Sequence, residues 1–387
     1  MRVAVTPSGP IQGYRVAVTG LGAITCAGVG VASLWSALAK PNAPESPRVG
    51  DFDASHLGGP KELRRFDPFT LYALMAADEA WRSSGLVGPI EDAGSIVTTG
   101  IGGLQTILEQ VRVLNDKGPD RVSPFMVPMM MPNAATAALS MRFGLGGPCE
   151  TVTTACAAGT HAIGNAARLI ASGRCSVAVA GGAEAVMTEI AIAGFRNMTA
   201  LSSLDLSRPF DLDRDGFVMG EGAGVLILEE WQHARERGAT IYAEVIGAAS
   251  TADAHHITAP DPEGRGAIRC MQLALDDAEL TTRDVSHVNA HGTSTPLNDL
   301  AEAVAMRQLF GDDVPPVTSI KGHLGHSLAA AGALEGVASV LTLFNQEIPP
   351  TAGTTNVDPE IGLDVVLGAP RRADVEVVLS NSFGFGG

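Results

Sequence analysis

The stretch Thr151-Val-Thr-Thr-Ala-Cys-Ala-Ala-Gly-Thr-His-Ala-Ile-Gly-Asn-Ala-Ala-Arg-Leu-Ile-Ala-Ser-Gly-Arg-Cys-Ser-Val-Ala-Val-Ala180 decides the fold of this chain. Its β-branched start predicts a strand, the alanine-rich segment 157–172 predicts a helix that ends at Gly173, and 176–180 predicts a second strand. Strand, helix and strand in this order form a βαβ unit. The sequence therefore predicts an α/β protein.

Further strands and helices alternate on both sides of this unit. Before it, we expect strands over 14–24 and from residue 96, and helices over 28–40 and 69–84. After it, we expect strands over 241–246, 285–290 and 316–320, with helices over 267–278, after Pro296 and over 327–344. This order predicts two similar halves, 1–240 and 241–387, without residue-level repetition. An irregular tail is expected before Tyr14 and a proline-rich loop over 41–47.

Composition narrows the class of protein. The 387 residues, 45% of them hydrophobic, are enough for a large buried core, which argues against a disordered or fibrous chain. A formal charge of -16 opposes binding to nucleic acid or to an anionic membrane surface. The 5 cysteines show no CxxC spacing, so we expect no disulfide framework and a reducing, cytoplasmic setting. The apolar stretch 327–344 is interrupted by Glu335, so no membrane span or secretion signal is expected.

Cys156 is the candidate nucleophile. It follows a predicted strand and precedes a predicted helix, whose N-terminal partial positive charge favours the thiolate. The alternative is a small buried core residue, the interpretation that we prefer for the other cysteines: Cys26, Cys149, Cys175 and Cys270.

Two histidines stand at similar junctions. His291 lies in the glycine- and hydroxyl-rich loop Asn289-Ala-His-Gly-Thr-Ser-Thr-Pro, which could present an imidazole and threonine hydroxyls to a substrate. His326 ends Ser319-Ile-Lys-Gly-His-Leu-Gly-His, directly before a predicted helix. His323 and His326 suggest a metal site as the alternative, but no third ligand accompanies them at a recognisable spacing, so we predict no metal.

Several segments in this order together resemble the β-ketoacyl-acyl-carrier-protein synthase II family of condensing enzymes, over nearly the whole chain. The segments that carry the resemblance are Thr154-Ala-Cys-Ala-Ala-Gly, the His291 loop, Lys321 through His326, Asn381-Ser-Phe-Gly-Phe-Gly-Gly, Arg208-Pro-Phe-Asp, Arg214-Asp-Gly-Phe-Val-Met-Gly-Glu-Gly-Ala and Asp253-Ala-His-His-Ile-Thr-Ala-Pro. The resemblance implies a thiolase-like fold: two pseudo-symmetric βαβαβαββ halves in an α-β-α-β-α layered arrangement, usually in a homodimer. Degradative thiolases share this fold but use a second, late cysteine, where this chain has a Gly-Phe-Gly run.

The resemblance also implies a mechanism. Cys156, in the N-terminal half, accepts an acyl group from a carrier's phosphopantetheine, with the backbone N–H groups of Cys156 and Phe385 as oxyanion hole. Malonyl-ACP then loses carbon dioxide, and His291 and His326, in the C-terminal half, stabilise the enolate. Lys321 orients the site electrostatically and pairs with Glu335. No cofactor is needed, because the substrates arrive on acyl carrier protein.

Binding residues are implied in the same way. By resemblance, Thr293 and Thr295 bind the pantetheine amides and Thr258 lines the same channel. Ile101, Met126 and Phe195 match the wall of the acyl pocket. Lys61, Arg64 and Arg65 form a basic cluster that matches the docking site for the acidic carrier, although a solvated helix face is the alternative.

The sequence leaves several questions open. The family pattern continues past Gly387 with a final strand, so the sequence is either truncated there or lacks this tail. A type II polyketide ketosynthase shares the same chemistry. A non-catalytic partner subunit that sets chain length is disfavoured, because such partners commonly replace the nucleophile with glutamine and Cys156 is present. A heterodimer with a related subunit is the alternative to the homodimer.

Overall fold

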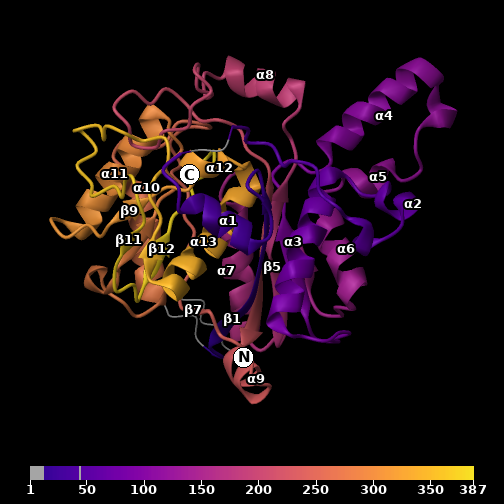
Figure 1. Ribbon diagram of the computed structural model, residues 1–387, viewed down its shortest axis with the longest axis horizontal. Coiled ribbons are helices and arrows are strands. Elements are labelled where there is room, and N and C mark those ends of the chain that lie inside the picture. The colour runs from indigo at the N-terminus through magenta and orange to yellow at the C-terminus, as the bar shows by residue number, and fades with distance from the viewer. Residues whose placement is uncertain (1–12, 43–44) are drawn as a thin grey trace.

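The computed structural model describes residues 13–42 and 45–387. Apart from Gly13, the tail predicted before Tyr14 lies outside the described residues, as do residues 43 and 44 of the predicted proline-rich loop. Figure 1 shows the N-terminal half on one side of the molecule, the C-terminal half on the other, and two long helices between them.

The larger sheet is 7-stranded, and its strands run in the order β2-β1-β6-β5-β3-β4, with β7 also paired to β1. It is mixed, because β6 is antiparallel to both of its neighbours while β3 is parallel to β4 and β5. The strands are β1 Val16–Thr25, β2 Gly28–Val29, β3 Gly94–Thr98, β4 Cys149–Glu150, β5 Val177–Glu184, β6 Gly222–Glu230 and β7 Ala243–Val245.

Helices cover both faces of this sheet because its strands are buried on both sides. Along β6, Val225 and Ile227 face the core under α3 (Pro68–Ser84) and α6 (Ala134–Phe143). Their neighbours Leu226 and Leu228 face the core under α7 (Ala158–Ala171) and α13 (Ala331–Asn345). This alternation is the two-residue period of a strand.

The second sheet is smaller and wholly parallel, in the order β12-β8-β9. Its strands are β8 His287–Asn289, β9 Val317–Thr318 and β12 Val378–Ser380, beside a separate hairpin of β10 Glu347–Ile348 and β11 Arg371–Arg372. The helices α10 (Arg265–Asp277) and α11 (Pro296–Phe310) share a core with this sheet. Because α13 contacts both β6 and β12, the layers follow the predicted α-β-α-β-α order.

The predicted elements are largely present, with two misplaced strands. The strand predicted from Thr151 lies earlier, as β4 at Cys149–Glu150, and residues 151–153 belong to no strand because the chain there already leads into the tight turn of Cys156. Helix α3 begins at the N-cap Asp67, whose carboxylate accepts a hydrogen bond from the amide of Phe69, and ends at the left-handed Gly85. The strand predicted over 241–246 was expected to open the second half, but β7 pairs with β1 of the first sheet. Two hydrogen bonds from the Arg15 guanidinium to the Glu244 carboxylate fix it there.

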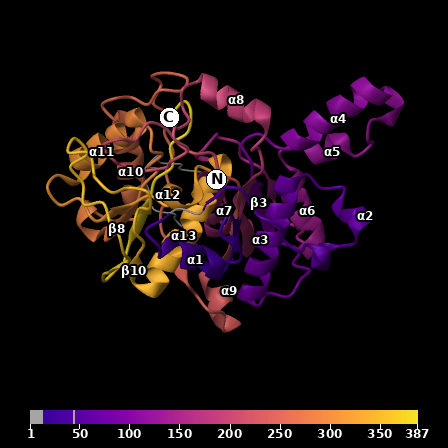
Figure 2. The same cartoon turned by 45° about the horizontal axis from the view of Figure 1, so that its top comes forward.

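Shorter helices surround these layers. Helices α4 and α5 project at one end of the molecule, and α8 lies along the edge that carries the C-terminus (Figures 1 and 2). The bounds of the shorter helices are α1 Val31–Leu38, α2 Pro60–Leu63, α4 Leu104–Lys117, α5 Met126–Met130, α8 Glu189–Asn197, α9 Trp231–Glu236 and α12 Lys321–Leu324, with 3-10 turns at Ser55–Leu57, Pro119–Arg121, Thr282–Asp284 and Leu328–Ala330.

Among the described residues, the segment Leu328–Asn345 is long and apolar enough to cross a membrane by length and composition, but 72% of it is buried inside the fold. It includes α13, which is packed between the two sheets. Its hydropathy is therefore explained by its place in the core.

Candidate active site

Cys156 lies in a strained turn at the start of α7. Ala155, immediately before it, has φ +49°, a left-handed conformation that is unfavourable for a residue with a Cβ atom. The turn is held by hydrogen bonds from the amide of Ala157 to the Thr154 carbonyl and from the amide of Ala158 to the Ala155 carbonyl. The predicted junction between strand and helix is thus a tight turn that presents the cysteine.

The helix behind Cys156 packs unusually close to its neighbour. A Cβ atom at Gly159 would lie 2.5 Å from the amide nitrogen of Ala333 and 2.7 Å from the carbonyl of Ala329. Glycine at this position therefore lets α7 approach the segment that follows His326. This contact joins the cysteine of the first half to the catalytic candidates of the second.

Lys321 is 1% exposed and connects His291 to Glu335. Its ammonium donates to the carboxylate of Glu335 and to the His291 carbonyl, 2.6 Å away, and lies 3.3 Å from His291 Nδ1. Ser382 also donates to Glu335, at 3.3 Å. The predicted Lys321–Glu335 pair is confirmed as a contact, and it is fully buried.

This arrangement fixes the tautomer of His291. An ammonium group has only donors, so Nδ1 of His291 must be the acceptor and the proton of the neutral ring is on Nε2. Burial lowers the pKa of His291 well below its usual value, and the charges of Lys321 and a protonated His326 lower it further. His291 is therefore a neutral ring whose Nε2–H can donate a hydrogen bond.

His326 stands perpendicular to His291, with ring centroids 5.4 Å apart. Its amide donates to the Val218 carbonyl at 2.7 Å, and its carbonyl accepts from the amide of Gly220 at 2.9 Å. Burial, followed by the charge of Lys321, lowers the pKa of His326 well below its usual value. Both histidines are thus neutral at physiological pH.

Cys156, His291 and His326 line one cavity of about 400 Å³. The same cavity is lined by the predicted Phe195, Thr258, Thr293, Thr295 and Phe385, and by Phe383, which was not predicted to take part. The rings of Phe195 and Phe217 meet edge to face at 5.5 Å on one wall. The cavity thus combines an apolar wall with hydroxyl groups and two imidazoles, which suits a ligand with both apolar and polar parts.

The segment 383–387 lies against the cysteine turn. A Cβ atom at Gly384 would lie 2.9 Å from the Thr154 carbonyl and 3.3 Å from Cβ of Ala155. Only glycine allows this approach, which brings the neighbouring Phe385 to the cavity. The position suits the predicted oxyanion-hole role of the Phe385 amide.

The protonation state of Cys156 differs from the sequence-based expectation. Burial raises the pKa of its thiol to about 12, and the charge of Lys321 opposes this increase only in part. Burial thus acts against the thiolate that the helix N-terminus was predicted to favour. The sulfur is a protonated thiol at physiological pH and must lose its proton when it attacks.

Two buried carboxylates support the site and were missed by the sequence analysis. Glu302 accepts hydrogen bonds from the amides of His291 and Gly292, each at 2.8 Å. Glu184 accepts from the amides of Gly100, at 2.8 Å, and Ala329, at 3.3 Å. Burial raises the pKa of both groups to about 7 against these hydrogen bonds. Glu302 could have been recognised in the sequence as an acidic residue on a helix face whose other residues are buried.

Some predicted residues lie elsewhere. The side chain of Ile101 is 41% exposed in the loop after β3, and Met126 is half-buried at the start of α5; neither lines the cavity of the single chain. Their assignment to the acyl pocket stays a prediction. His323 donates from Nε2–H to the Lys40 carbonyl oxygen, 2.8 Å away, and it does not line the cavity of Cys156 and His326.

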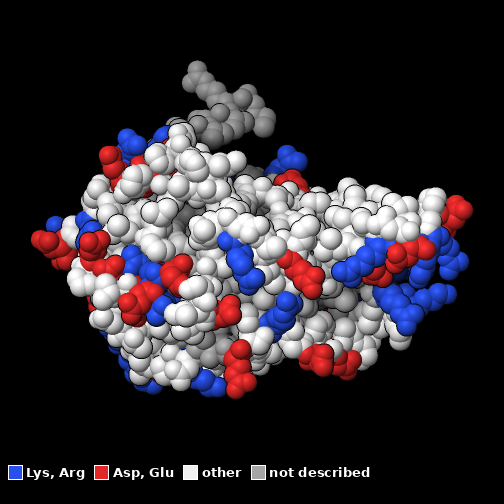
Figure 3. Space-filling view, turned by 90° about the horizontal axis from the view of Figure 1, so that it is seen from above, with Lys and Arg blue, Asp and Glu red and all other residues white. Residues whose placement is uncertain are grey.

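The predicted carrier-docking residues Lys61, Arg64 and Arg65 are exposed on and just after α2. The Arg65 guanidinium stacks over the ring of Phe125 at 4.5 Å. Basic side chains gather at this end of the molecule, together with some acidic ones (Figure 3). Within the described residues no group of three or more His, Cys, Asp or Glu side chains could hold a metal ion.

Comparison with known families decides the assignment. The profile for the beta-ketoacyl synthase N-terminal domain matches residues 41–234, and the profile for the C-terminal domain matches residues 242–355. The chain belongs to the beta-ketoacyl synthase family. As the sequence predicted, this beta-ketoacyl synthase is an acyltransferase-type condensing enzyme with a thiolase-like fold.

Individual relatives agree with this membership. A protein of Synechocystis sp. named 3-oxoacyl-(acyl-carrier-protein) synthase 2 is 45% identical over 402 aligned positions, which cover 97% of each chain. A solved structure described as the ishigamide ketosynthase/chain length factor superposes with a TM-score of 0.91 at 34% identity, over 97% of each chain. Another, described as a type II PKS acyl-carrier protein in complex with its ketosynthase bound to the hexaketide, has a TM-score of 0.87 at 30% identity, also over 97% of each chain.

Proposed function

We propose that this beta-ketoacyl synthase extends an acyl chain held on Cys156 by decarboxylative condensation with malonyl-ACP, in fatty acid elongation. The convergence of Cys156, His291 and His326 on one cavity, with Lys321 behind His291, carries the proposal. The Synechocystis relative, named for the same activity, supports it.

In the first step, the sulfur of Cys156 attacks the carbonyl carbon of an acyl thioester. The bond to the carrier's sulfur breaks, and the released carrier thiolate takes up the thiol proton of Cys156 and leaves as a thiol. The amides of Cys156 and Phe385 stabilise the oxyanion that forms on the way. The close contact between Gly384 and the Thr154–Ala157 turn supports this pairing of amides.

In the second step, malonyl-ACP loses carbon dioxide, and the electron pair of the broken C–C bond becomes an enolate. Nε2–H of His291 and the ring of His326 donate hydrogen bonds to the enolate oxygen. The nucleophilic carbon then attacks the carbonyl carbon of the acyl-cysteine, the bond to the Cys156 sulfur breaks, and the released thiolate takes up a proton from solvent. Decarboxylation makes the step favourable, so no cofactor is required.

The carrier's phosphopantetheine arm enters past Thr258, Thr293 and Thr295, whose side chains line the cavity together. We assign the acyl chain to the pocket wall with Phe195, Ile101 and Met126. The exposed cluster Lys61, Arg64 and Arg65 is the docking site for an acidic carrier. The relative described as a complex of acyl-carrier protein and ketosynthase supports a carrier as partner.

We further propose that the enzyme works as a homodimer. Large apolar side chains around α4 and α5 are exposed in the single chain, which favours a covering partner: Ile101, Val111, Leu114, Phe125, Val127 and Met131. A heterodimer with a related subunit is the alternative. None of the five cysteines forms a disulfide, which fits a reducing cytoplasm.

A type II polyketide ketosynthase is the second candidate, favoured by the similarity to the two solved ketosynthases. The experiment that separates them supplies acyl-ACP, malonyl-ACP and the protein, with and without a ketoreductase, and identifies the products by mass spectrometry. A single two-carbon extension that awaits reduction supports fatty acid elongation. Repeated extension without reduction supports the polyketide function, and no condensation contradicts both.

A further inference from the structure

The turn that carries Thr293 and Thr295 is built on a strained residue. Ser294 is fully buried and has φ +70°, a left-handed conformation that favours glycine. On either side of it, the hydroxyl groups of Thr293 and Thr295 lie 2.9 Å apart, and both side chains line the cavity. Their positions therefore depend on the backbone conformation of Ser294.

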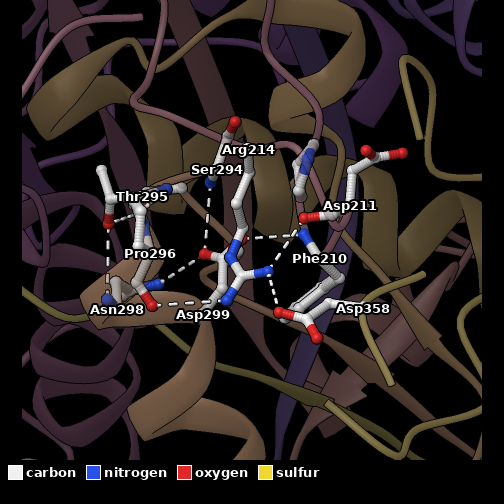
Figure 4. Close-up of polar contacts among 12 residues, drawn as sticks. Phe210, Asp211, Arg214, Ser294, Thr295, Pro296, Asn298, Asp299 and Asp358 are labelled. Carbon is white, nitrogen blue, oxygen red and sulfur yellow. Dashed lines mark hydrogen bonds and ion pairs between the residues drawn. The ribbon is translucent and has the colours of Figure 1, made fainter. Parts of the chain in front are cut away.

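The carboxylate of Asp299 holds Ser294 in its left-handed conformation through hydrogen bonds to backbone amides. One carboxylate oxygen accepts from the Ser294 amide at 3.2 Å, and the other accepts from the amide of Phe210 at 2.8 Å (Figure 4). Asp299 itself is fully buried in the first turn of α11, four residues after the Thr295 N-cap. A buried carboxylate needs a compensating charge.

Arg214 supplies that charge and a second anchor. Its Nε is 3.8 Å from Asp299 and has no hydrogen-bond partner among the described residues. Its terminal nitrogens donate to Asp358 at 2.6 Å and to the carbonyls of Asp211, at 2.8 Å, and Pro296, at 3.5 Å. The guanidinium thus joins the start of α11 to the loop that carries Arg214.

The same loop reaches the catalytic centre. The amides of Arg208 and Gly216 donate to Oγ and to the carbonyl of Ser294, each at 3.0 Å. A few residues later, the loop is hydrogen-bonded on both sides of His326 through Val218 and Gly220. The loop that carries Arg214 therefore fixes the position of the threonine turn relative to His326.

We propose that Arg214 and Asp299 are positioning residues that hold Ser294 in its left-handed conformation and so set the two threonine hydroxyls for the amides of the carrier arm. This inference rests on the proposed function and deepens it. It assigns a role in substrate binding to an ion pair that touches no substrate. Disturbing the pair should raise KM for substrates that carry the pantetheine amides and leave kcat nearly unchanged.

The experiment compares Cys156 acylation by an acyl-pantetheine with acylation by an acyl thioester of ethanethiol, which has no amide. Arg214→Lys keeps the charge but loses the planar fork of donors. Its KM for acyl-pantetheine should rise about tenfold, which corresponds to about 1.4 kcal/mol, the size of one net hydrogen bond. Acylation by the amide-free thioester should not change. Arg237→Lys, at the half-buried ion pair of Arg237 with Glu229 outside the cavity, is the control and should leave both KM values unchanged.

A suppressor isolates the backbone effect. Ser294→Gly and Ser294→Ala both remove the hydroxyl, but only glycine reaches φ +70° without strain. In the Arg214→Lys background, glycine should restore KM for acyl-pantetheine and alanine should not. If Arg214→Lys does not fold, Asp299→Asn takes its place in the same comparison.

Three results would overturn the inference: equal losses on both thioesters, an unchanged KM in a folded variant, or equal effects of glycine and alanine. A wild-type protein that acylates Cys156 with neither thioester overturns the proposed function, and this inference with it. The two failures are therefore distinguishable.

Discussion

Replacing Lys321 by methionine removes the charge behind His291 and keeps a side chain of similar length. In the native site, Lys321 Nζ lies 3.3 Å from His291 Nδ1 and so holds the ring proton on Nε2. A hydrogen bond from a charged donor is worth about 1.5–3 kcal/mol, a tautomer preference of about ten- to a hundredfold. Without it, the ring loses both its anchor and its fixed donor.

The expected effect on chemistry is that of losing one preorganised donor. Malonyl decarboxylation should slow by about 10²- to 10³-fold, because the enolate oxygen loses a correctly placed hydrogen bond. Acylation of Cys156 should fall much less, because its oxyanion is held by backbone amides. A large loss of decarboxylation with a small loss of acylation would thus show that Lys321 acts through His291.

Stability must be separated from this effect. Lys321→Met leaves Glu335 buried and without its cation, which costs about 3–5 kcal/mol of unfolding free energy. The double variant Lys321→Met/Glu335→Gln removes both charges and should recover most of that stability. It should not recover decarboxylation.

The assay measures carbon dioxide release from malonyl-ACP, acyl loading by intact-protein mass spectrometry, and denaturant unfolding for all three proteins. Recovery of decarboxylation in the double variant would mean that Lys321 is only structural. Equal losses of loading and decarboxylation would refute the assignment of Lys321 to His291.

Three further predictions follow from the same geometry. Gly384→Ala should slow acylation of Cys156 by about 10²-fold or more, because the added Cβ atom would lie 2.9 Å from the Thr154 carbonyl and displace the Phe385 amide. Gly194→Ala is the control: its Cβ atom meets nothing within 4 Å, so its acylation kinetics should not change. Reversing the charges of Lys61, Arg64 and Arg65 should slow association of the carrier protein by about tenfold or more and make the association rate less dependent on salt. Reaction with small thioesters should not change. Equal losses for carrier-bound and small thioesters would contradict a role of these residues in carrier docking. Burial raises the pKa of Glu302 from 4.5 to about 7, so between these pH values the native state binds one proton more than the unfolded state, and stability should fall as pH rises. Glu302→Gln should reduce the slope of unfolding free energy against pH by up to about 1.4 kcal/mol per pH unit in this range. An unchanged slope would show that Glu302 does not titrate there.

The sequence predicted those parts of the site that have a local signal. Cys156, His291 and His326 each stand where a strand or loop meets a helix, and glycines and hydroxyl residues mark these junctions. The long helices, such as α3, were predictable because their apolar period and caps are contained in the segment itself. The layer order followed from the family resemblance, and the alternation of strands and helices agreed with it.

The remaining features depend on contacts between distant segments. Glu302 lies in a helix and Glu184 at the end of a strand. Only the tertiary fold brings their carboxylates to the backbone amides that donate hydrogen bonds to them. The pairing of β7 with β1 was not predicted, because a strand of three residues carries no information about its partner. The raised pKa of the Cys156 thiol comes from tertiary burial, which no local sequence pattern shows.

Intact-protein mass spectrometry after incubation with acyl-ACP, followed by peptide mapping, tests directly whether Cys156 is the nucleophile. We expect one acyl group per chain, located on Cys156, which disappears when malonyl-ACP is added and a chain longer by two carbons is released. The Cys156→Ala variant should take up no acyl group. An acyl group on another residue, or retained loading of this variant, would contradict the assignment of Cys156 as the nucleophile.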